Sequence, residues 1–409
     1  MPRSALSVPN FRTYFISAAI AQCGGWLLRT TQAWLVLDLT GSPAALAAVT
    51  IAQALPVTIL TLFAGIMIDR TQSRRLLVFV QLILGGQAAV MAVLIFTRQI
   101  QFWHIIVLAS VLGVASAVDF PTRSAIVSEL LEPHLVGNGI ALNSAMGSAA
   151  RIIGPGVGGV MIATLGSGVC FAVTAAAYAG TTLGLVVLRS EEFYPKRLAR
   201  KTALFKQLVE GVRYSFSTPS LAVNMVLAGF YGTFAYNWAL VLPLMARYAL
   251  NAGAEGFGAL NMAMGAGSTI GAFALATRLK PSMRLLLLSA AAFGAFILVL
   301  AHAPDLPTAL VMLVFTGILS VSFNATNNTL LQVEAREDIR GRVLSLYMFL
   351  MVGTTPLGSA ITGSIANTFD VRLALQVNAA LCLVGLALAA LFLRRAHAQR
   401  QLAEYADGI

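Results

Sequence analysis

Ionisable residues inside apolar stretches are the first candidates for chemistry in this sequence. There are four of them: Arg29, Asp38, Asp119 and Arg151. An ionisable side chain within a membrane costs about 3 kcal/mol on insertion scales, so it normally faces a water-filled cavity or a partner. The two arginines could hold an anionic substrate, and a carboxylic acid that titrates could carry a proton. Alternatively, one or both arginines are structural and are satisfied by helix carbonyls, Gln32, Gln53 or Asp119.

Polar and aromatic side chains in other apolar stretches could contact the same substrate. Gln22 and Trp26 share a helical face with Arg29. Aromatic rings suit bulky amphiphilic ligands, and amides bind without fixed charge. For any single residue, ordinary packing between helices is the alternative. The predicted substrate-binding set is Gln22, Trp26, Arg29, Arg151, Tyr231, Phe234, Tyr236, Trp238, Asn324, Asn327 and Asn328.

The composition predicts which elements position these residues. Of 409 residues, 58% are apolar and 11% are charged, and the mean hydropathy is +0.82. Soluble proteins carry roughly a quarter charged residues. Because so few charges cannot cover a soluble surface, we predict an all-α polytopic membrane protein in a lipid bilayer.

Windows of about 19 residues predict twelve spans. They lie near residues 12–38, 44–67, 76–97, 102–122, 138–163, 168–188, 219–246, 256–277, 283–302, 307–332, 342–367 and 372–393. An even number of spans puts both termini on one side, and 22 of the 27 Lys and Arg residues lie on that side. The positive-inside rule therefore places both termini in the cytoplasm, with the chain in the cytoplasmic (inner) membrane.

One long connection divides the chain into two halves. We predict a six-helix bundle over residues 1–188, a cytoplasmic linker over 189–218, a second six-helix bundle over 219–393 and a cytoplasmic tail over 394–409. Within the linker, Leu204, Leu208, Val212 and Phe216 recur every four residues, with Lys206 and Arg213 off this stripe. This spacing fits an amphipathic helix on the inner membrane surface, and an ordinary linker with some helix is the alternative.

Glycines recur between the halves at an offset of 204 residues. The pairs are Gly137 with Gly341, Gly154 with Gly358, and Gly159 with Gly363. Such a repeat predicts two pseudo-symmetric halves related by an axis along the membrane normal, with the substrate path between them.

Several motifs carry a family resemblance. Residues 65–75 read GIMIDRTQSRR and resemble the loop between helices two and three of the major facilitator superfamily, although Gln72 stands where many members have glycine. Further segments read WLLRTTQAWLVLDLTGSP, GNGIALNSAMGSAARIIGPGVGG, VLPLMARYAL and NNTLLQVEAREDIRGRVLSLYMFLMVGTTPLGS. Together they resemble the twelve-span drug:proton antiporter branch that holds the enterobactin exporter and macrolide efflux proteins. The resemblance covers nearly the whole chain and implies the major facilitator fold, alternating access, and a cavity lined by helices one, four, seven and ten.

The resemblance also implies gating residues. Arg74 or Arg75 is expected to pair with Asp119, which begins the segment DFPTRSAIVSEL at the end of the fourth span, and this network must break for the protein to face inward. Alternatively, the arginines of the loop only enforce topology. Small residues and a proline in the fifth span permit close helix approach and bending. The predicted gating set is Gly65, Asp69, Arg70, Arg74, Arg75, Asp119, Gly154, Pro155, Gly158 and Gly159.

Proton coupling is assigned to Asp38 and Asp119. Asp38 lies near the outer end of the first span, where a solvated carboxylate at a helix end is the alternative. Relatives in this branch often carry Asp before the tryptophan of the first span, whereas this chain has Ala33 before Trp34. Coupling here must therefore use Asp38, Asp119 or another group, or the protein is not a proton antiporter.

Other classes of protein fit poorly. Four scattered histidines and three cysteines in apolar segments give no metal-ligand spacing, and no phosphate-binding loop is present. The bases behind the net charge of +11 lie between apolar runs, which does not fit a nucleic-acid binder. We therefore predict a monomeric exporter without cofactors, not an enzyme, that moves small amphiphilic organic molecules of drug, macrolide or siderophore type by proton antiport. The alternatives are a lysolipid or amphiphile flippase, a metabolite or organic-anion importer or exchanger, and a sensor without transport.

Overall fold

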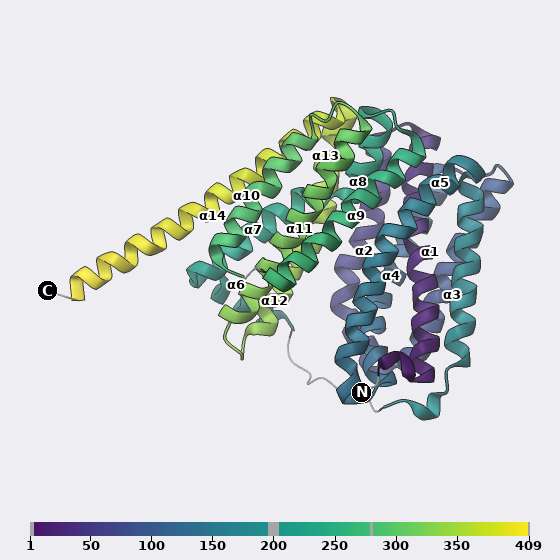
Figure 1. Cartoon of the computed structure of the whole chain (residues 1–409), viewed down its shortest axis with the longest axis horizontal. Coiled ribbons are helices and arrows are strands. Elements are labelled where there is room, and N and C mark those ends of the chain that lie inside the picture. Colours follow the sequence, from purple (N-terminus) through teal and green to yellow (C-terminus); the bar gives the residue numbers. More distant parts are fainter. Residues whose placement is uncertain (1–3, 195–203, 279–280, 408–409) are drawn as a thin grey trace. The chain divides into compact units, whose positions relative to one another are not determined.

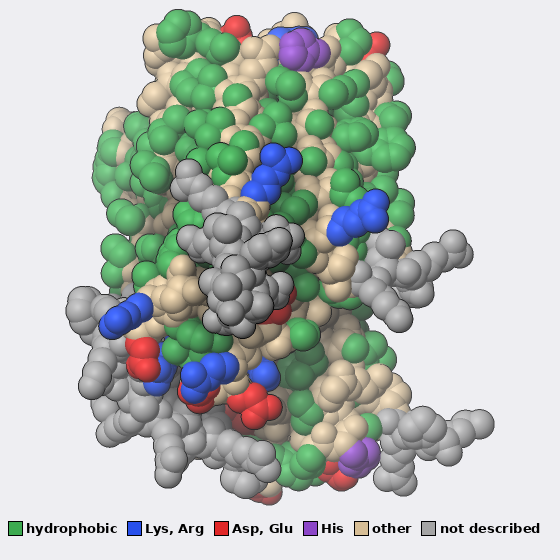
Figure 2. All heavy atoms as spheres, turned by 90° about the vertical axis from the view of Figure 1, so that its left-hand side faces the viewer, with side chains coloured by type: hydrophobic (Ala, Val, Ile, Leu, Met, Phe, Trp, Pro, Cys, Tyr) green, Lys and Arg blue, Asp and Glu red, His purple; other side chains and the backbone are tan. Residues whose placement is uncertain are grey.

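The computed structural model describes residues 4–194, 204–278 and 281–407, with the side chains of 61–70, 190, 204–209, 276–278 and 395–407 outside the description. Throughout the described residues the regular structure is helical (Figure 1). Nine of the described helical segments are long and apolar enough to cross a membrane. On the face seen in Figure 2, hydrophobic side chains form a broad expanse between acidic side chains near its upper edge and in its lower part. This distribution fits a bilayer-spanning protein.

The first half of the chain folds into long helices that begin close to where the predicted spans begin. They are η1 (Ala5–Ser7), α1 (Pro9–Thr40), α2 (Pro43–Arg70), α3 (Ser73–Phe96), α4 (Phe102–Leu130) and α5 (Pro133–Val187). Helix α5 holds the fifth and sixth spans, because Gly166 interrupts it with a φ of 80°. Proline suits the first turn of α1 and α5, where its missing N–H has no intrahelical acceptor.

The second half adds shorter and more interrupted helices. They are η2 (Ser190–Glu192), α6 (Leu204–Ser217), α7 (Pro219–Phe234), α8 (Trp238–Leu244), η3 (Met245–Ala249), α9 (Gly253–Arg278), α10 (Met283–Leu300), α11 (Leu306–Glu334), α12 (Arg340–Met348), η4 (Phe349–Gly353), α13 (Thr355–Thr368) and α14 (Val371–Asp407). The seventh span comprises α7, α8 and η3, and the eleventh comprises α12, η4 and α13. With α5 counted as two, the helices account for all twelve predicted spans.

The seventh span is broken, which the hydropathy pattern does not predict. Helix α7 ends at Phe234, and α8 begins at Trp238. Asn237 lies in the break, where its Nδ2 donates to the Thr233 carbonyl at 2.6 Å and its Oδ1 accepts from the Ser359 hydroxyl at 3.2 Å. An interrupted helix is tolerated at membrane depth only where such partners satisfy its polar groups.

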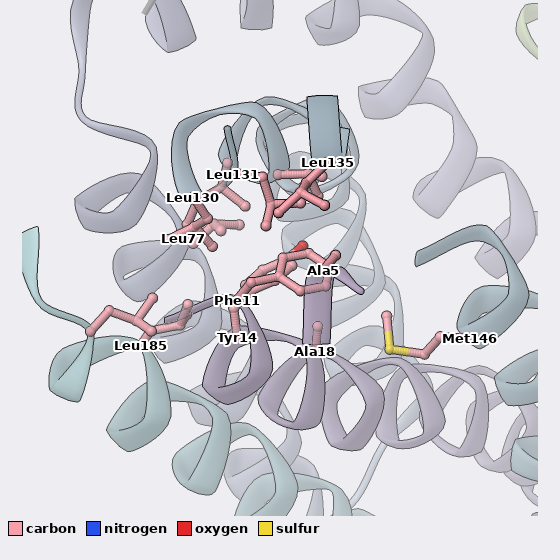
Figure 3. Packing of buried hydrophobic residues seen from close by; sticks show 13 residues of the cluster. Ala5, Phe11, Tyr14, Ala18, Leu77, Leu130, Leu131, Leu135, Met146 and Leu185 are labelled. Carbon is pink, nitrogen blue, oxygen red and sulfur yellow. The ribbon is translucent and has the colours of Figure 1, made fainter. Parts of the chain in front are cut away.

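The chain forms two compact units. Unit 1 comprises Met1–Arg200 together with Leu242–Gly265, and unit 2 comprises Lys201–Val241 together with Ala266–Ile409. In unit 1, α1 and α3 pack against α5, and α2 packs against α4. A buried apolar cluster joins the start of α1 to the turn between α4 and α5, and Figure 3 shows its labelled members, including Phe11, Tyr14, Leu130, Leu131 and Leu135.

Unit 2 is organised around α7. This helix packs against α14, while α10 packs against α11. The linker segment contains helix α6, which contacts α7 and α12. Glu210 of α6 forms an ion pair with Arg342 of α12 at 2.6 Å. The α6 residues Val212 and Phe216 are exposed apolar side chains. The side chains of Leu204, Lys206 and Leu208 lie outside the described residues.

Repeat-related glycines lie at equivalent helix contacts within each unit. A methyl group added at Gly154 of α5 would stand 2.5 Å from Cβ of Trp26 in α1. A methyl group added at Gly358 of α13 would overlap the Thr233 carbonyl oxygen of α7. The fifth span thus packs closely against the first in unit 1. In the same way, the eleventh span packs closely against the seventh in unit 2. Glycine at these positions lets the helix backbones approach closely.

Replacing either glycine by alanine is therefore expected to destabilise the protein. Overpacking typically costs about 1–3 kcal/mol, so Gly154→Ala and Gly358→Ala should lower the midpoint of thermal unfolding by several degrees, measured by intrinsic fluorescence in detergent. Gly86→Ala is the control, because no neighbouring atom lies within 4 Å of a methyl group added there. Equal midpoints for all three variants would contradict the close helix contacts.

Candidate functional site

Unit 1 brings together the polar residues that the sequence predicts on its first and fifth spans. Arg29 of α1 donates from Nη2 to the Ser116 hydroxyl of α4 at 3.1 Å. Arg151 of α5 places its guanidinium carbon 5.6 Å from the ring centroid of Trp26 in α1, which is a cation–π contact. Oε1 of Gln22 lies 3.1 Å from the position of a methyl group built on Gly147 of α5. Three helices thus converge on one polar face.

Both guanidinium groups in this face have neutral partners. Among the described residues, no carboxylate lies within 4.0 Å of Arg29 or Arg151. The amides that could have satisfied Arg29 are engaged with each other, since Gln53 Nε2 donates to Gln32 Oε1 at 3.0 Å. Both arginine residues are exposed. The face therefore presents positive charge that no described acid neutralises.

A partly buried ionic network lies one helical turn from Ser116 along α4. Asp119 accepts from Arg123 Nε through Oδ2 at 2.7 Å and from Gln81 Nε2 through Oδ1 at 2.8 Å. Tyr14 of α1 donates its hydroxyl to the Arg123 carbonyl at 3.2 Å. Arg123 is buried, with 8% of its surface exposed. Ser116 precedes Asp119 by three residues, about 4.5 Å along the helix axis, so the network adjoins the polar face around Arg29.

The expected pairing of Arg74 or Arg75 with Asp119 is not formed. Arg74 Nε donates to the Leu185 carbonyl at 2.9 Å, and its Nη2 donates to the Val186 carbonyl. The last carbonyls of a helix such as α5 lack intrahelical donors, which makes them good partners for a nearby arginine. Asp119 meets Arg123 because the two are four residues apart on one helix.

Other members of the predicted gating set lie at the end of α2 and the start of α3. Arg75 is exposed at the start of α3. Gly65, Asp69 and Arg70 lie in the part of α2 whose side chains are not described, residues 61–70.

The glycine-rich part of α5 contacts two elements of unit 1. A methyl group on Gly158 would stand 3.1 Å from Leu27 Cδ1 of α1, and one on Gly159 would stand 2.6 Å from the Ala254 carbonyl oxygen of α9. Pro155 precedes both contacts and is buried. This stretch therefore joins α1 to the segment 242–265, which the second half of the chain contributes to unit 1.

The C-terminal end of α1 holds an ion pair that the sequence did not predict. Asp38 accepts from Nη1 of Arg247 at 2.5 Å, and the Arg247 guanidinium carbon lies 5.8 Å from the ring centroid of Trp34. Trp34 stacks on Phe257 of α9 with centroids 6.0 Å apart. Tyr248 donates its hydroxyl to the Gly41 carbonyl at 2.7 Å. Asp38 is thus paired rather than simply solvated.

One feature of the sequence points to this ion pair. Arg247 is not among the 22 bases that the predicted spans place on the side of the termini, and Asp38 lies near the predicted outer end of the first span.

The predicted lining residues of the second half lie in unit 2, and two of them are fully buried. Tyr231 donates its hydroxyl to the Ala290 carbonyl at 2.7 Å, and Asn327 Nδ2 donates to the Asn224 carbonyl at 3.3 Å. Both have 0% of their surface exposed, so they pack between helices. The partly exposed members of the set are Phe234, Tyr236, Trp238, Asn324 and Asn328.

Tyr236 and Trp238 border the break in the seventh span. Tyr236 donates to the Ser320 carbonyl at 2.7 Å, and Trp238 lies against Phe293 with ring centroids 6.4 Å apart. No group of three or more His, Cys, Asp or Glu residues suited to a metal ion occurs in the described part of the chain.

Comparison with known proteins places this arrangement in context. A family model described as transmembrane secretion effector matches residues 2–406. The multidrug efflux pump Tap of Mycolicibacterium fortuitum is 28% identical over 367 residues, covering 86% of this chain and 88% of Tap. The staphyloferrin A transporter of Staphylococcus aureus is 24% identical over 362 residues, covering 88% of this chain and 90% of that protein. The crystal structure of the nucleoside transporter NupG shares the fold, with a TM-score of 0.73 at 13% identity over 94% of this chain and 99% of NupG.

Separating the buried ion pair is expected to be costly. In Arg123→Gln, the partly buried Asp119 loses its cation, and breaking a pair that is largely shielded from water costs up to about 3–5 kcal/mol. The midpoint of thermal unfolding should fall clearly, and the double variant Asp119→Asn/Arg123→Gln should recover much of the loss. Arg336→Gln is the matched control, because it breaks an exposed pair with Asp338 at 2.9 Å. A double variant no more stable than Arg123→Gln would contradict the coupling.

Proposed function

The chain belongs to the transmembrane secretion effector family of the major facilitator superfamily, and on this premise we propose that it exports small amphiphilic organic molecules across the cytoplasmic (inner) membrane. It is a multi-pass membrane transporter and not an enzyme, as the sequence predicts. In this proposal, export proceeds by alternating access and is coupled to proton entry. The protein acts as a monomer with both termini in the cytoplasm, in agreement with the distribution of its basic residues.

The match of the family model over residues 2–406 is the observation that carries export. It runs through both halves of the chain, and relatives named as an efflux pump and a siderophore transporter cover most of it. The polar face of unit 1 supports the proposed substrate site. The face formed by Gln22, Trp26, Arg29 and Arg151 combines an aromatic ring, an amide and charge, as expected of a site for an amphiphile. In the second half, the partly exposed side chains near the helix break are the proposed contacts.

Asp119 is the proposed proton carrier. Its carboxylate is paired with Arg123 and Gln81, and it lies one turn from Ser116, the partner of Arg29. Protonation removes the charge that holds Arg123 and so frees a buried cation, which changes the electrostatic environment of the adjoining polar face. This proximity gives a direct route by which proton binding and substrate binding influence each other.

The pair formed by Asp38 and Arg247 is the proposed outer latch. Arg247 belongs to a segment, Leu242–Gly265, that packs in unit 1 although the chain enters it from unit 2 and returns to unit 2. A change in which the two units move against each other must therefore bend the chain at the ends of this segment or release its contacts. Gly158 and Gly159 let α5 pack closely against α1 and α9, so that these helices can close the proposed outer side. Pro155 permits α5 to bend.

Proton-driven export can be tested with purified protein in liposomes. An imposed pH gradient should drive movement of a fluorescent amphiphile, and adding that amphiphile should in turn move protons, recorded with a lumenal pH dye. Asp119→Asn/Arg123→Gln should abolish the proton signal because it removes the titrating group while avoiding an unpaired buried charge. Substrate movement without proton flux in the unaltered protein would exclude proton antiport.

Exchanging the charges of Asp38 and Arg247 distinguishes two roles of Asp38, a latch and a proton carrier. Asp38→Arg and Arg247→Asp should each slow transport at least several-fold, since each brings two like charges together. The combined exchange restores opposite charges and should recover most of the rate in the same liposome assay. Failure of the exchange, together with loss of proton flux in Asp38→Asn, would assign proton transfer to Asp38 instead.

A further inference from the structure

Two cations of unit 1, Arg29 and Arg151, have no acidic partner among the described residues. Arg29 contacts the Ser116 hydroxyl, and Arg151 contacts the ring of Trp26. Both partners are neutral. Within the described residues, these are the only hydrogen-bond or ring contacts that either guanidinium group makes. Two positive charges therefore stand on one face formed by α1, α4 and α5.

Both arginines lie several turns from the ends of their helices. Arg151 lies about 27 Å of helix from Pro133, the first residue of α5, and about 22 Å from the interruption at Gly166. Arg29 lies about 30 Å from Pro9 and about 17 Å from Thr40, the two ends of α1. Arginines near helix ends extend to the interface, but arginines at this depth need a partner inside the membrane.

The acids nearest along α1 and α4 to Arg29 and Ser116 are already engaged. Asp119 is one turn from Ser116, but its two oxygens accept from Arg123 and Gln81. Asp38, on the same helix as Arg29, is paired with Arg247. The face around Arg29 and Arg151 thus keeps a net positive charge when the protein is empty.

We infer that Arg29 and Arg151 bind an anionic group of the substrate, which rests on the proposed function and narrows it to the export of organic anions. Guanidinium groups match carboxylate, sulfonate and phosphate oxygens, often with two parallel hydrogen bonds. The ring of Trp26 holds Arg151 in place from one side, and Gln22 offers an uncharged contact to the adjoining part of the molecule. Cationic amphiphiles are disfavoured at this face because the two arginines repel them.

A matched pair of probes tests how much a negative charge on the ligand contributes to binding. Dansylaminoundecanoic acid and its methyl ester share the fluorophore and the alkyl chain, and differ only in the charge of one end. Binding is measured by dansyl fluorescence to the full-length protein in nanodiscs of zwitterionic lipid, with empty nanodiscs as background. We expect the unaltered protein to bind the acid at least tenfold more tightly than the ester.

Variants at the two arginines assign this preference to the site. Arg29→Gln and Arg151→Gln should each reduce affinity for the acid about tenfold or more while leaving the ester unaffected. Arg29→Lys and Arg151→Lys keep the charge and should retain part of the preference, which a purely structural role would not produce. Arg284→Gln, at an exposed position in the first turn of α10, is the control for the loss of one positive charge. Thermal unfolding confirms that each variant is folded.

The outcomes separate this inference from the proposed function. Equal binding of acid and ester by the unaltered protein, or unchanged preference in both glutamine variants, overturns the anionic site and leaves export of amphiphiles standing. Binding of neither probe overturns export of amphiphiles itself. Selective loss of acid binding in the glutamine variants supports the inference.

The anionic group could belong to a free organic acid or to a lipid headgroup. Repeating the titration in nanodiscs that contain phosphatidylglycerol separates the two sources. Displacement of the acid by this lipid assigns a headgroup phosphate, and undiminished binding assigns a free organic anion. Both results retain the pair of arginines as an anion site.

Discussion

A charge inside a bilayer must have a partner, and this constraint organises the polar residues of unit 1. Asp119 pairs with Arg123, and Asp38 pairs with Arg247. Arg74 satisfies the exposed carbonyls at the end of α5. Among the described residues, Arg29 and Arg151 meet only neutral groups, so they differ from the other charged residues of this unit. In a transporter, a charge at membrane depth without an opposite charge beside it marks a candidate ligand site, because the ligand can supply the opposite charge.

Close helix approach is the second requirement, because polar partners inside a membrane must be brought within hydrogen-bond distance. Gly154 and Gly158 let α5 lie directly against α1. The same approach sets Arg151 over Trp26 and leaves Arg29 free to reach Ser116 on α4. The glycines that pack the unit are therefore also the residues that assemble its polar face. A side chain added at these positions should disturb packing and binding together.

The proposed coupling depends on how near the two polar groups of α4 lie. Ser116 belongs to the face around Arg29, whereas Asp119 belongs to the buried pair with Arg123. One turn of helix separates them, so no long pathway is needed between proton and substrate. The proposed outer latch at Asp38 works differently. Its partner lies in a segment that belongs to unit 1 by packing and to the second half by sequence, which ties the latch to movement between the halves.

The sequence by itself determined the helices, their number and the membrane setting, because these follow from hydropathy, helix length and the placement of Lys and Arg. It also marked Arg29, Arg151, Trp26 and Gln22 as candidates for a site, since polar and aromatic residues stand out in apolar spans. Only the tertiary structure decided which charges meet. Asp119 pairs with Arg123 and not with Arg74, and Asp38 pairs with Arg247, which lies 209 residues away. Likewise, the break at Asn237 and the burial of Tyr231 depend on partners from other helices. Hydropathy is a property of a segment, whereas pairing depends on the three-dimensional distance between segments, which no local pattern encodes.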